Sequence, residues 1–140
     1  MKIFFRLAIM LVICCFTLNS AAQTTNNLQA AIPCFGGYTG GAISVGDHLG
    51  DTLAFTDSLV NQRFVIASFN LALKCNGNVI KYMENKKGNT LTQEMKEAVL
   101  SLHQNCTLNF DGIKSRSRQK DPFGKYTETR HKPLVLKVGK

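Results

Sequence analysis

The fold is decided by the stretch FVIASFNLALKCNGNVIKYMENKKGNTLTQEMKEAVLSLHQNCTLNFD, residues 64–111. Its first part places an apolar side chain at every second position, and a pleated strand puts such residues on one face. The pattern predicts a strand that ends at Cys75 and has one face formed by Val65, Ala67, Phe69, Leu71 and Leu73. The dipeptide Asn76-Gly77 follows at once and favours a tight hairpin turn, because both residues tolerate positive φ angles. Residues 79–83 then form the returning strand.

A capped helix is predicted after Gly88. Thr92 is a good N-cap, because its hydroxyl can accept a hydrogen bond from a backbone N–H of the first turn. Apolar residues recur at helical spacing and predict one stripe against the sheet: Met95, Ala98, Val99 and Leu102. Alternation resumes in residues 106–110, which predicts another strand. The order is therefore strand, turn, strand, helix, strand, which is a small α+β element.

The flanking sequence predicts shorter elements. Short strands are expected at 32–35, 53–55, 126–130 and 134–138, a polar turn at 56–58, and a Pro-Gly turn at 121–124. Residues 42–45 predict either a strand or the entry to a short helical turn through Leu49. The paired glycines at 36–37 and 40–41 lack the Lys and Ser/Thr of a phosphate-binding loop, so turns explain them more simply.

The first residues are typical of an export signal. Lys2 and Arg6 precede an apolar run over 7–18, and small residues at 20–22 suit cleavage after Ala22. We therefore expect a signal peptide at 1–22, a flexible segment at 23–32 and one domain at 33–140. The run is short for a bilayer span, so an uncleaved anchor is the weaker alternative. A periplasmic or secreted location follows, with no membrane span after signal removal.

Three cysteines remain beyond the signal: Cys34, Cys75 and Cys106. An oxidising compartment permits a disulfide, and Cys75 and Cys106 both fall at the ends of predicted strands. A Cys75–Cys106 disulfide is the preferred pairing, and three free thiols are the alternative. No metal site is expected, because the chain has no C-x-x-C pair and its histidines show no ligand spacing.

Positive charge is concentrated near the C-terminus. The whole chain has a net charge of +8, and residues 112–140 contain nine Lys and Arg against two Asp and Glu. The densest run offers four candidate binding residues: Lys114, Arg116, Arg118 and Lys120. Such a run suits an anionic surface, and a solvated hairpin loop is the simpler alternative. Nucleic acid is not expected as a partner, because the run has no interleaved aromatic residues and no known reader motif.

Several segments together resemble the C-terminal domain of the gliding-motility protein GldM, a periplasmic component of the type IX secretion machinery of Bacteroidetes. They include Asn76-Gly77-Asn78, Leu91-Thr92-Gln93-Glu94-Met95, Leu108-Asn109-Phe110-Asp111-Gly112-Ile113-Lys114 and Leu134-Val135-Leu136-Lys137-Val138. The resemblance covers about residues 33–138. It implies a mainly β (α+β) fold, an immunoglobulin-like β-sandwich with one amphipathic helix, that serves as an interaction module without a cofactor.

Two classes of function follow from these features. The first is an exported, non-enzymatic protein-interaction module of the cell envelope, in secretion or gliding, with a protein partner or a second copy of the chain. The second is a small secreted hydrolase or a protein inhibitor. A hydrolase would need Cys34 with His48 or His131, and Cys34 is not at a helix start that would lower its pKa. An inhibitor would present the loop at 115–124.

Overall fold

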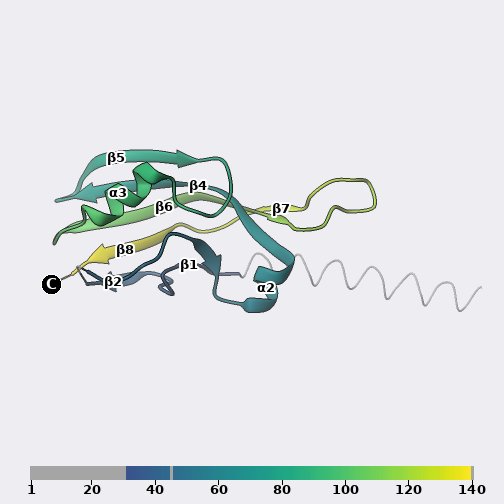
Figure 1. Cartoon of the computed structure of the whole chain (residues 1–140), viewed down its shortest axis with the longest axis horizontal. Helices are drawn as coiled ribbons and strands as arrows, with labels where there is room; N and C mark the ends of the chain where they lie inside the picture. Colours follow the sequence, from purple (N-terminus) through teal and green to yellow (C-terminus); the bar gives the residue numbers. More distant parts are fainter. Residues whose placement is uncertain (1–30, 45, 140) are drawn as a thin grey trace, which may run out of the picture. The chain divides into compact units, whose positions relative to one another are not determined.

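The computed structural model describes residues 31–44 and 46–139 (Figure 1). The predicted signal peptide and residues 23–30 lie outside the described residues. The strands are β1 Pro33–Phe35, β2 Gly41–Ile43, β3 Leu53–Phe55, β4 Phe64–Cys75, β5 Asn78–Asn85, β6 Cys106–Ser117, β7 Glu128–Arg130 and β8 Leu134–Val138. The helices are α2 Ser58–Arg63 and α3 Gln93–Leu100. The domain is therefore mainly β with a helical component, as predicted.

One large sheet organises the domain. It has six strands in the order β2-β8-β6-β4-β5, with β7 paired to β6 beyond this path. β1 and β3 form a separate two-stranded sheet. The small sheet covers one face of the large one, because the Phe35 ring of β1 lies 5.0 Å from the Phe110 ring of β6. β3 is tied to the segment before α3, since Leu53 N donates to Asn89 O at 2.8 Å.

The core lies between these layers. Its fully buried members come from both sheets and from α3: Phe35, Leu53, Ile66, Phe69, Leu71, Met95, Leu108, Phe110, Ile113, Leu134 and Leu136. Burying each of these side chains contributes roughly 1.5–3 kcal/mol relative to an exposed one. Among the described residues, no helix is long and apolar enough to cross a membrane.

The predicted order of 64–111 is confirmed. β4 and β5 are joined by a turn in which Asn76 and Gly77 have φ angles of 51° and 81°, as the Asn-Gly signal requires. Thr92 is the N-cap of α3, and its hydroxyl accepts from Met95 N at 3.3 Å. Met95 and Ala98 are buried, whereas Val99 and Leu102 are only half-buried. The apolar stripe of α3 is therefore narrower than predicted.

The predicted core face of β4 is wrong in its first half. Phe64 and Ile66 are buried there, whereas Val65 and Ala67 are only half-buried. The register with β6 shifts between Ile66 and Ser68 and again between Ser68 and Asn70, so the inward phase of the strand reverses at this bulge. From Phe69 onward the predicted face is correct.

β6 reverses its phase opposite the same point. Its buried residues are Leu108 and Phe110 before Gly112, and Ile113 and Ser115 after it. Gly112 has φ +57°, and a Cβ there would lie 2.7 Å from the Asn70 Nδ2 atom. Both conditions favour glycine, so Gly112 allows β6 to follow the bulge of β4.

Two further predictions differ from the structure. The polar turn at 56–58 is the start of a second helix, α2, because the Asp57 carboxylate caps it by accepting from Leu59 N at 2.8 Å. The basic run does not lie wholly in a loop, because β6 extends to Ser117 and includes Lys114 and Arg116. A long hairpin strand can carry charged residues on a solvated face, and β6 continues to Ser117, beyond its last apolar residue.

The Cys75–Cys106 disulfide is confirmed. The two residues are cross-strand neighbours in register, with Cα atoms 4.0 Å apart and a sequence separation of 31. A bridge that closes a loop of this size stabilises a domain by roughly 3–4 kcal/mol on the chain-entropy account. Cys34 is a free, half-buried thiol.

The bulge makes a testable prediction from two neighbouring residues. Ile66→Ala should lower the free energy of unfolding by roughly 2–4 kcal/mol, because a fully buried side chain is truncated. Val65→Ala should cost about 1 kcal/mol or less, since Val65 is only half-buried. Urea melts of both variants check this. A larger loss of unfolding free energy for Val65→Ala than for Ile66→Ala would mean that Val65 faces the core. That result would agree with uninterrupted alternation along β4 and would contradict the bulge.

Candidate functional site

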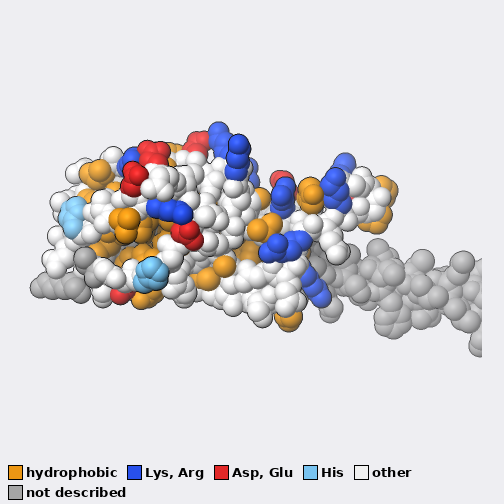
Figure 2. Space-filling view, viewed as in Figure 1, with side chains coloured by type: hydrophobic (Ala, Val, Ile, Leu, Met, Phe, Trp, Pro, Cys, Tyr) orange, Lys and Arg blue, Asp and Glu red, His pale blue; other side chains and the backbone are white. Residues whose placement is uncertain are grey.

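A basic cleft lies where the bulge of β4 meets the base of the β6–β7 hairpin. It has a volume of about 610 Å³, and residues of β4, β6, β7 and the loop after β5 line it. Its charged lining residues are Lys86, Lys87, Lys114, Arg116 and Glu128. In Figure 2, most of the visible Lys and Arg side chains gather over the half of the domain that ends in this hairpin.

Strand geometry places two of the predicted binding residues in this cleft. Lys114 and Arg116 are two positions apart on β6, so both project from the same face, while Ser115 between them is buried. Their neighbours on β4 are Ser68 and Val65 respectively. Both β4 neighbours are half-buried and line the cleft together with the two cations.

Two lysines that the sequence analysis did not single out complete the cleft. Lys86 and Lys87 follow β5 directly, and the buried Asn85 side chain fixes their loop. Its Oδ1 accepts from Lys87 N at 2.9 Å, and its Nδ2 donates to Thr90 O at 2.7 Å. The sequence feature that could have indicated these two lysines is an asparagine at the end of a strand, followed by Lys-Lys-Gly, because this pattern is typical of a structured turn.

The bulge holds this loop in place. Gly88 N donates to the carbonyl oxygen of Ala67, the unpaired residue of β4, at 2.8 Å. A bulge residue has no partner in its ladder, so its carbonyl is available for such a bond. The register shift therefore both opens the cleft and attaches its basic loop.

The four predicted binding residues do not form one cluster. Arg116 and Lys120 both lie over the ring of Tyr126, with Cζ and Nζ at 4.9 and 5.4 Å from its centroid. Arg118 turns away, and its Nε donates to the carbonyl oxygen of Asn61 in α2 at 2.9 Å. Lys114 and Arg116 thus belong to the cleft, Lys120 extends it toward the hairpin, and Arg118 has a structural contact.

Positive charge in the cleft is largely uncompensated. Lys86 forms an exposed ion pair with Glu84 at 2.9 Å, and this partner raises the pKa of Lys86. Within the described part of the chain, no carboxylate forms an ion pair with Lys87, Lys114 or Arg116. Among the described lining residues the one carboxylate is Glu128, the cross-strand neighbour of Arg116, so the cations outnumber it and the surface attracts anionic groups.

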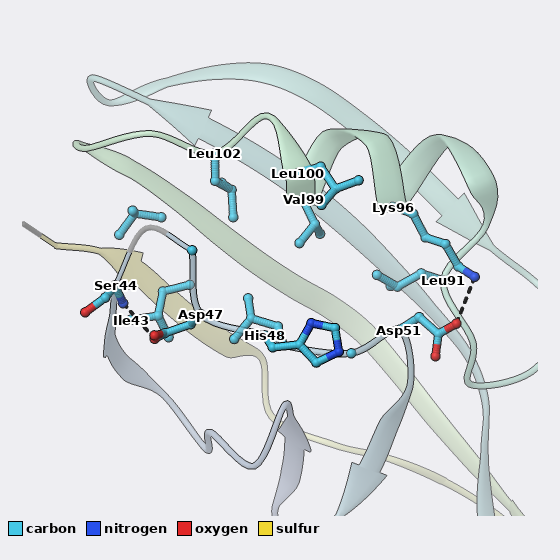
Figure 3. Close-up of a pocket in the computed structure, with 14 residues that line it drawn as sticks. Ile43, Ser44, Asp47, His48, Asp51, Leu91, Lys96, Val99, Leu100 and Leu102 are labelled. Carbon is cyan, nitrogen blue, oxygen red and sulfur yellow. Dashed lines mark hydrogen bonds and ion pairs between the residues drawn. The ribbon is translucent and has the colours of Figure 1, made fainter.

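A second hollow lies between α3 and the segment after β2. It has a volume of about 680 Å³ and a mainly apolar lining that includes Val99, Leu100 and Leu102, shown in Figure 3. The charged residues at its rim already form ion pairs or hydrogen bonds within the domain. Lys96 pairs with Asp51 at 2.8 Å, a contact that lowers the pKa of Asp51, and Asp47 accepts from Ser44 N at 2.8 Å.

Two arrangements bear on hydrolase chemistry. The Ser115 hydroxyl lies 2.8 Å from the His131 Nε2 atom, but Ser115 is fully buried, whereas a nucleophile has to be accessible to its substrate. Among the described residues, no carboxylate forms an ion pair with His131 to orient its ring as in a catalytic triad. Burial raises the pKa of the Cys34 thiol, which is opposite to the shift that activates a nucleophile.

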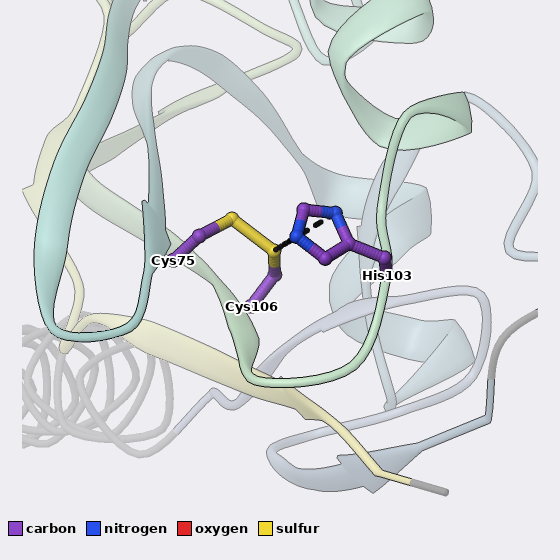
Figure 4. Close-up of side chains that lie close together, drawn as sticks. All are labelled: Cys75, His103 and Cys106. Atoms are coloured by element: carbon purple, nitrogen blue, oxygen red, sulfur yellow. Dashed lines mark hydrogen bonds between the residues drawn. A yellow bond between two sulfur atoms is a disulfide. The ribbon is translucent and has the colours of Figure 1, made fainter.

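A group of potential metal ligands surrounds the disulfide (Figure 4). Donor atoms of Cys75, His103 and Cys106 all lie within 4.8 Å of one another. The spacing of the three histidines in the sequence did not predict a metal site. The overlooked signal was the His103-x-x-Cys106 spacing just before β6, which a turn can close.

Comparison with known proteins gives no family. No family model matches the chain, and no curated protein matches it.

The burial of His131 predicts a pH dependence of stability. Burial lowers its pKa in the folded state, so the unfolded chain takes up a proton first as the pH falls below about 6.5. The contribution of the neutral ring to stability is therefore present above that pH and is lost below it. Thermal melts from pH 8 to pH 5 should show a steeper decline for the wild type than for His131→Gln, which can keep a hydrogen bond with Ser115.

The exposed His48 is the control for this measurement, because His48→Gln changes a histidine without a buried environment. Its melts should follow the wild type. Parallel curves for the wild type and His131→Gln would show that His131 is not the group responsible.

Proposed function

We propose that the protein is an exported, non-enzymatic interaction module that binds an acidic segment of a cell-envelope protein through the basic cleft. The observation that supports this most directly is that Lys86 and Lys87 of the loop after β5 and Lys114 and Arg116 of β6 line one concave surface. Cations that share a rigid concave surface steer an anionic partner and select against other partners.

The resemblance to the C-terminal domain of GldM supports the same class of function. Two of the segments that carry the resemblance lie in β6 and β8, and we propose that the domain is an immunoglobulin-like β-sandwich, as the resemblance implies. An association with type IX secretion or gliding machinery follows from the resemblance alone. The resembling family acts in the periplasm, where a partner would be another envelope protein or a second copy of the chain.

A periplasmic or secreted location is part of the proposal. The Cys75–Cys106 disulfide supports it, because such bridges persist mainly in oxidising compartments. The apolar, positively charged start of the sequence supports it as well.

A hydrolase is the less favoured function. The enclosed Ser115 and the raised pKa of Cys34 both argue against an accessible, activated nucleophile. An inhibitor keeps one supporting observation. Phe123, at the turn of the β6–β7 hairpin, is 87% exposed, and Figure 1 shows this hairpin projecting from one end of the sheet. A projecting loop with an exposed aromatic residue is the kind of element that enters a partner's pocket.

Binding of an acidic peptide tests the proposed function. A Glu-rich peptide should bind the wild type, and replacing Lys86, Lys87, Lys114 and Arg116 by Gln should weaken binding by about 10- to 100-fold. Four exposed charge contacts at about 0.2–1 kcal/mol each correspond to about 4- to 900-fold in affinity, and the expected loss is the middle of that range. Affinity should also fall as salt rises, because the Debye length shrinks from about 10 Å at 0.1 M. Fluorescence anisotropy at low and high salt measures both effects.

The matched control replaces four cations that do not line the cleft: Lys74, Lys125, Lys132 and Lys137. The change in net charge is identical, so an equal loss of affinity would mean that binding follows total charge and not the cleft. Arg118→Gln should leave affinity unchanged, because its guanidinium contacts Asn61.

A further inference from the structure

The ends of two strands hold three potential zinc ligands together. The Cys106 Sγ atom lies 3.5 Å from Nδ1 and 3.6 Å from Nε2 of His103. In a tetrahedral zinc site, bonds of about 2.3 Å to sulfur and about 2.0–2.1 Å to nitrogen place the two ligand atoms roughly 3.5 Å apart. His103 is thus already at the separation that a shared metal ion would need.

The backbone around these residues is fixed from both sides. Cys106 N donates to His103 O at 3.2 Å, which closes the turn between α3 and β6. Asn76 N donates to Asn105 O at 3.1 Å, which joins this turn to the β4–β5 hairpin beside Cys75. The three ligands would therefore stay close together even without the covalent bridge.

The three side chains differ in their burial. Cys75 and Cys106 are buried, whereas His103 is exposed. In Figure 4 the imidazole of His103 lies beside the sulfur of Cys106. Rotation of the exposed ring can bring either nitrogen toward the sulfurs, so an ion would enter from the side of His103.

We propose that reduction of the Cys75–Cys106 disulfide converts this cluster into a site for one zinc ion, bound by both thiolates and the His103 imidazole. The disulfide and the metal are then alternative cross-links of β4 and β6. Three protein ligands leave a fourth position for water, as in zinc sites that exchange a ligand. Thiolates favour zinc over hard cations such as magnesium.

The conversion balances with a thiol as the reductant. Two small-molecule thiols become one disulfide while the Cys75–Cys106 bond opens to two protein thiols. Binding of zinc then releases the two thiol protons and forms two sulfur–zinc bonds. Reoxidation by a disulfide compound reverses both steps and releases the ion, so occupancy of the site follows the redox state.

Titration of the reduced full chain with cobalt and zinc ions tests the proposal. The chain carries Cys14→Ser, Cys15→Ser and Cys34→Ser, so that only Cys75 and Cys106 remain as thiols. A phosphine reductant avoids competing thiols, since it becomes a phosphine oxide with oxygen from water. We expect thiolate-to-cobalt charge-transfer absorption that saturates at one equivalent and is displaced by zinc. The oxidised chain should show no such absorption.

His103→Ala should weaken zinc binding by about 100-fold or more, because even outer-shell partners of metal ligands contribute about 10- to 100-fold. His48→Ala is the matched control and should bind zinc with the same affinity as the chain that keeps both His48 and His103. Equal affinity for His103→Ala, or no saturation at one equivalent, would overturn the site. Circular dichroism covers the case in which the reduced chain unfolds. Zinc should then restore the folded spectrum, and failure to restore it would overturn the proposal as well.

Discussion

The reversal of inward phase at the paired irregularities of β4 and β6 is the constraint on which the rest of the structure depends. β4 buries Phe64 and Ile66 before its irregularity and switches to the opposite alternation from Phe69 onward. β6 buries Leu108 and Phe110 before Gly112 and switches in the same way from Ile113 onward. Because both strands reverse at the same level, their core face stays continuous. A reversal in only one strand would expose an apolar set on the solvated face.

The same reversal connects the fold to the candidate site. The Ala67 carbonyl left without a ladder partner receives the Gly88 amide, and this bond fixes the basic loop beside Lys114 and Arg116. The cleft lies at the end of β4 that includes Val65, and the disulfide lies at the other end of the strand. The proposed partner surface and the proposed redox-dependent metal site therefore occupy opposite ends of one long strand.

Much of the fold could be predicted, because its signals are local. The Asn-Gly turn, the Thr92 cap and the alternation of 106–110 each specify a short piece of backbone. The bulge could not be read from the sequence, since Ala67 and Ser68 are small enough for either face. The helix α2 was missed because none of its residues is buried, so it carries no apolar stripe. The cleft depends on pairing between segments that are distant in the sequence. The sequence therefore did not indicate that Lys86 and Lys87 line the same cleft as Lys114.

The most direct test of the central claim is amide hydrogen exchange at Gly88, measured by NMR on the native chain. The account predicts that this amide is strongly protected, at a level close to the amides in the middle of β4, because it donates to Ala67 across the bulge. Exchange at the rate of an unstructured Lys-Lys-Gly segment would contradict the account. The basic loop would then not be attached to β4, and the cleft would not be a preformed site.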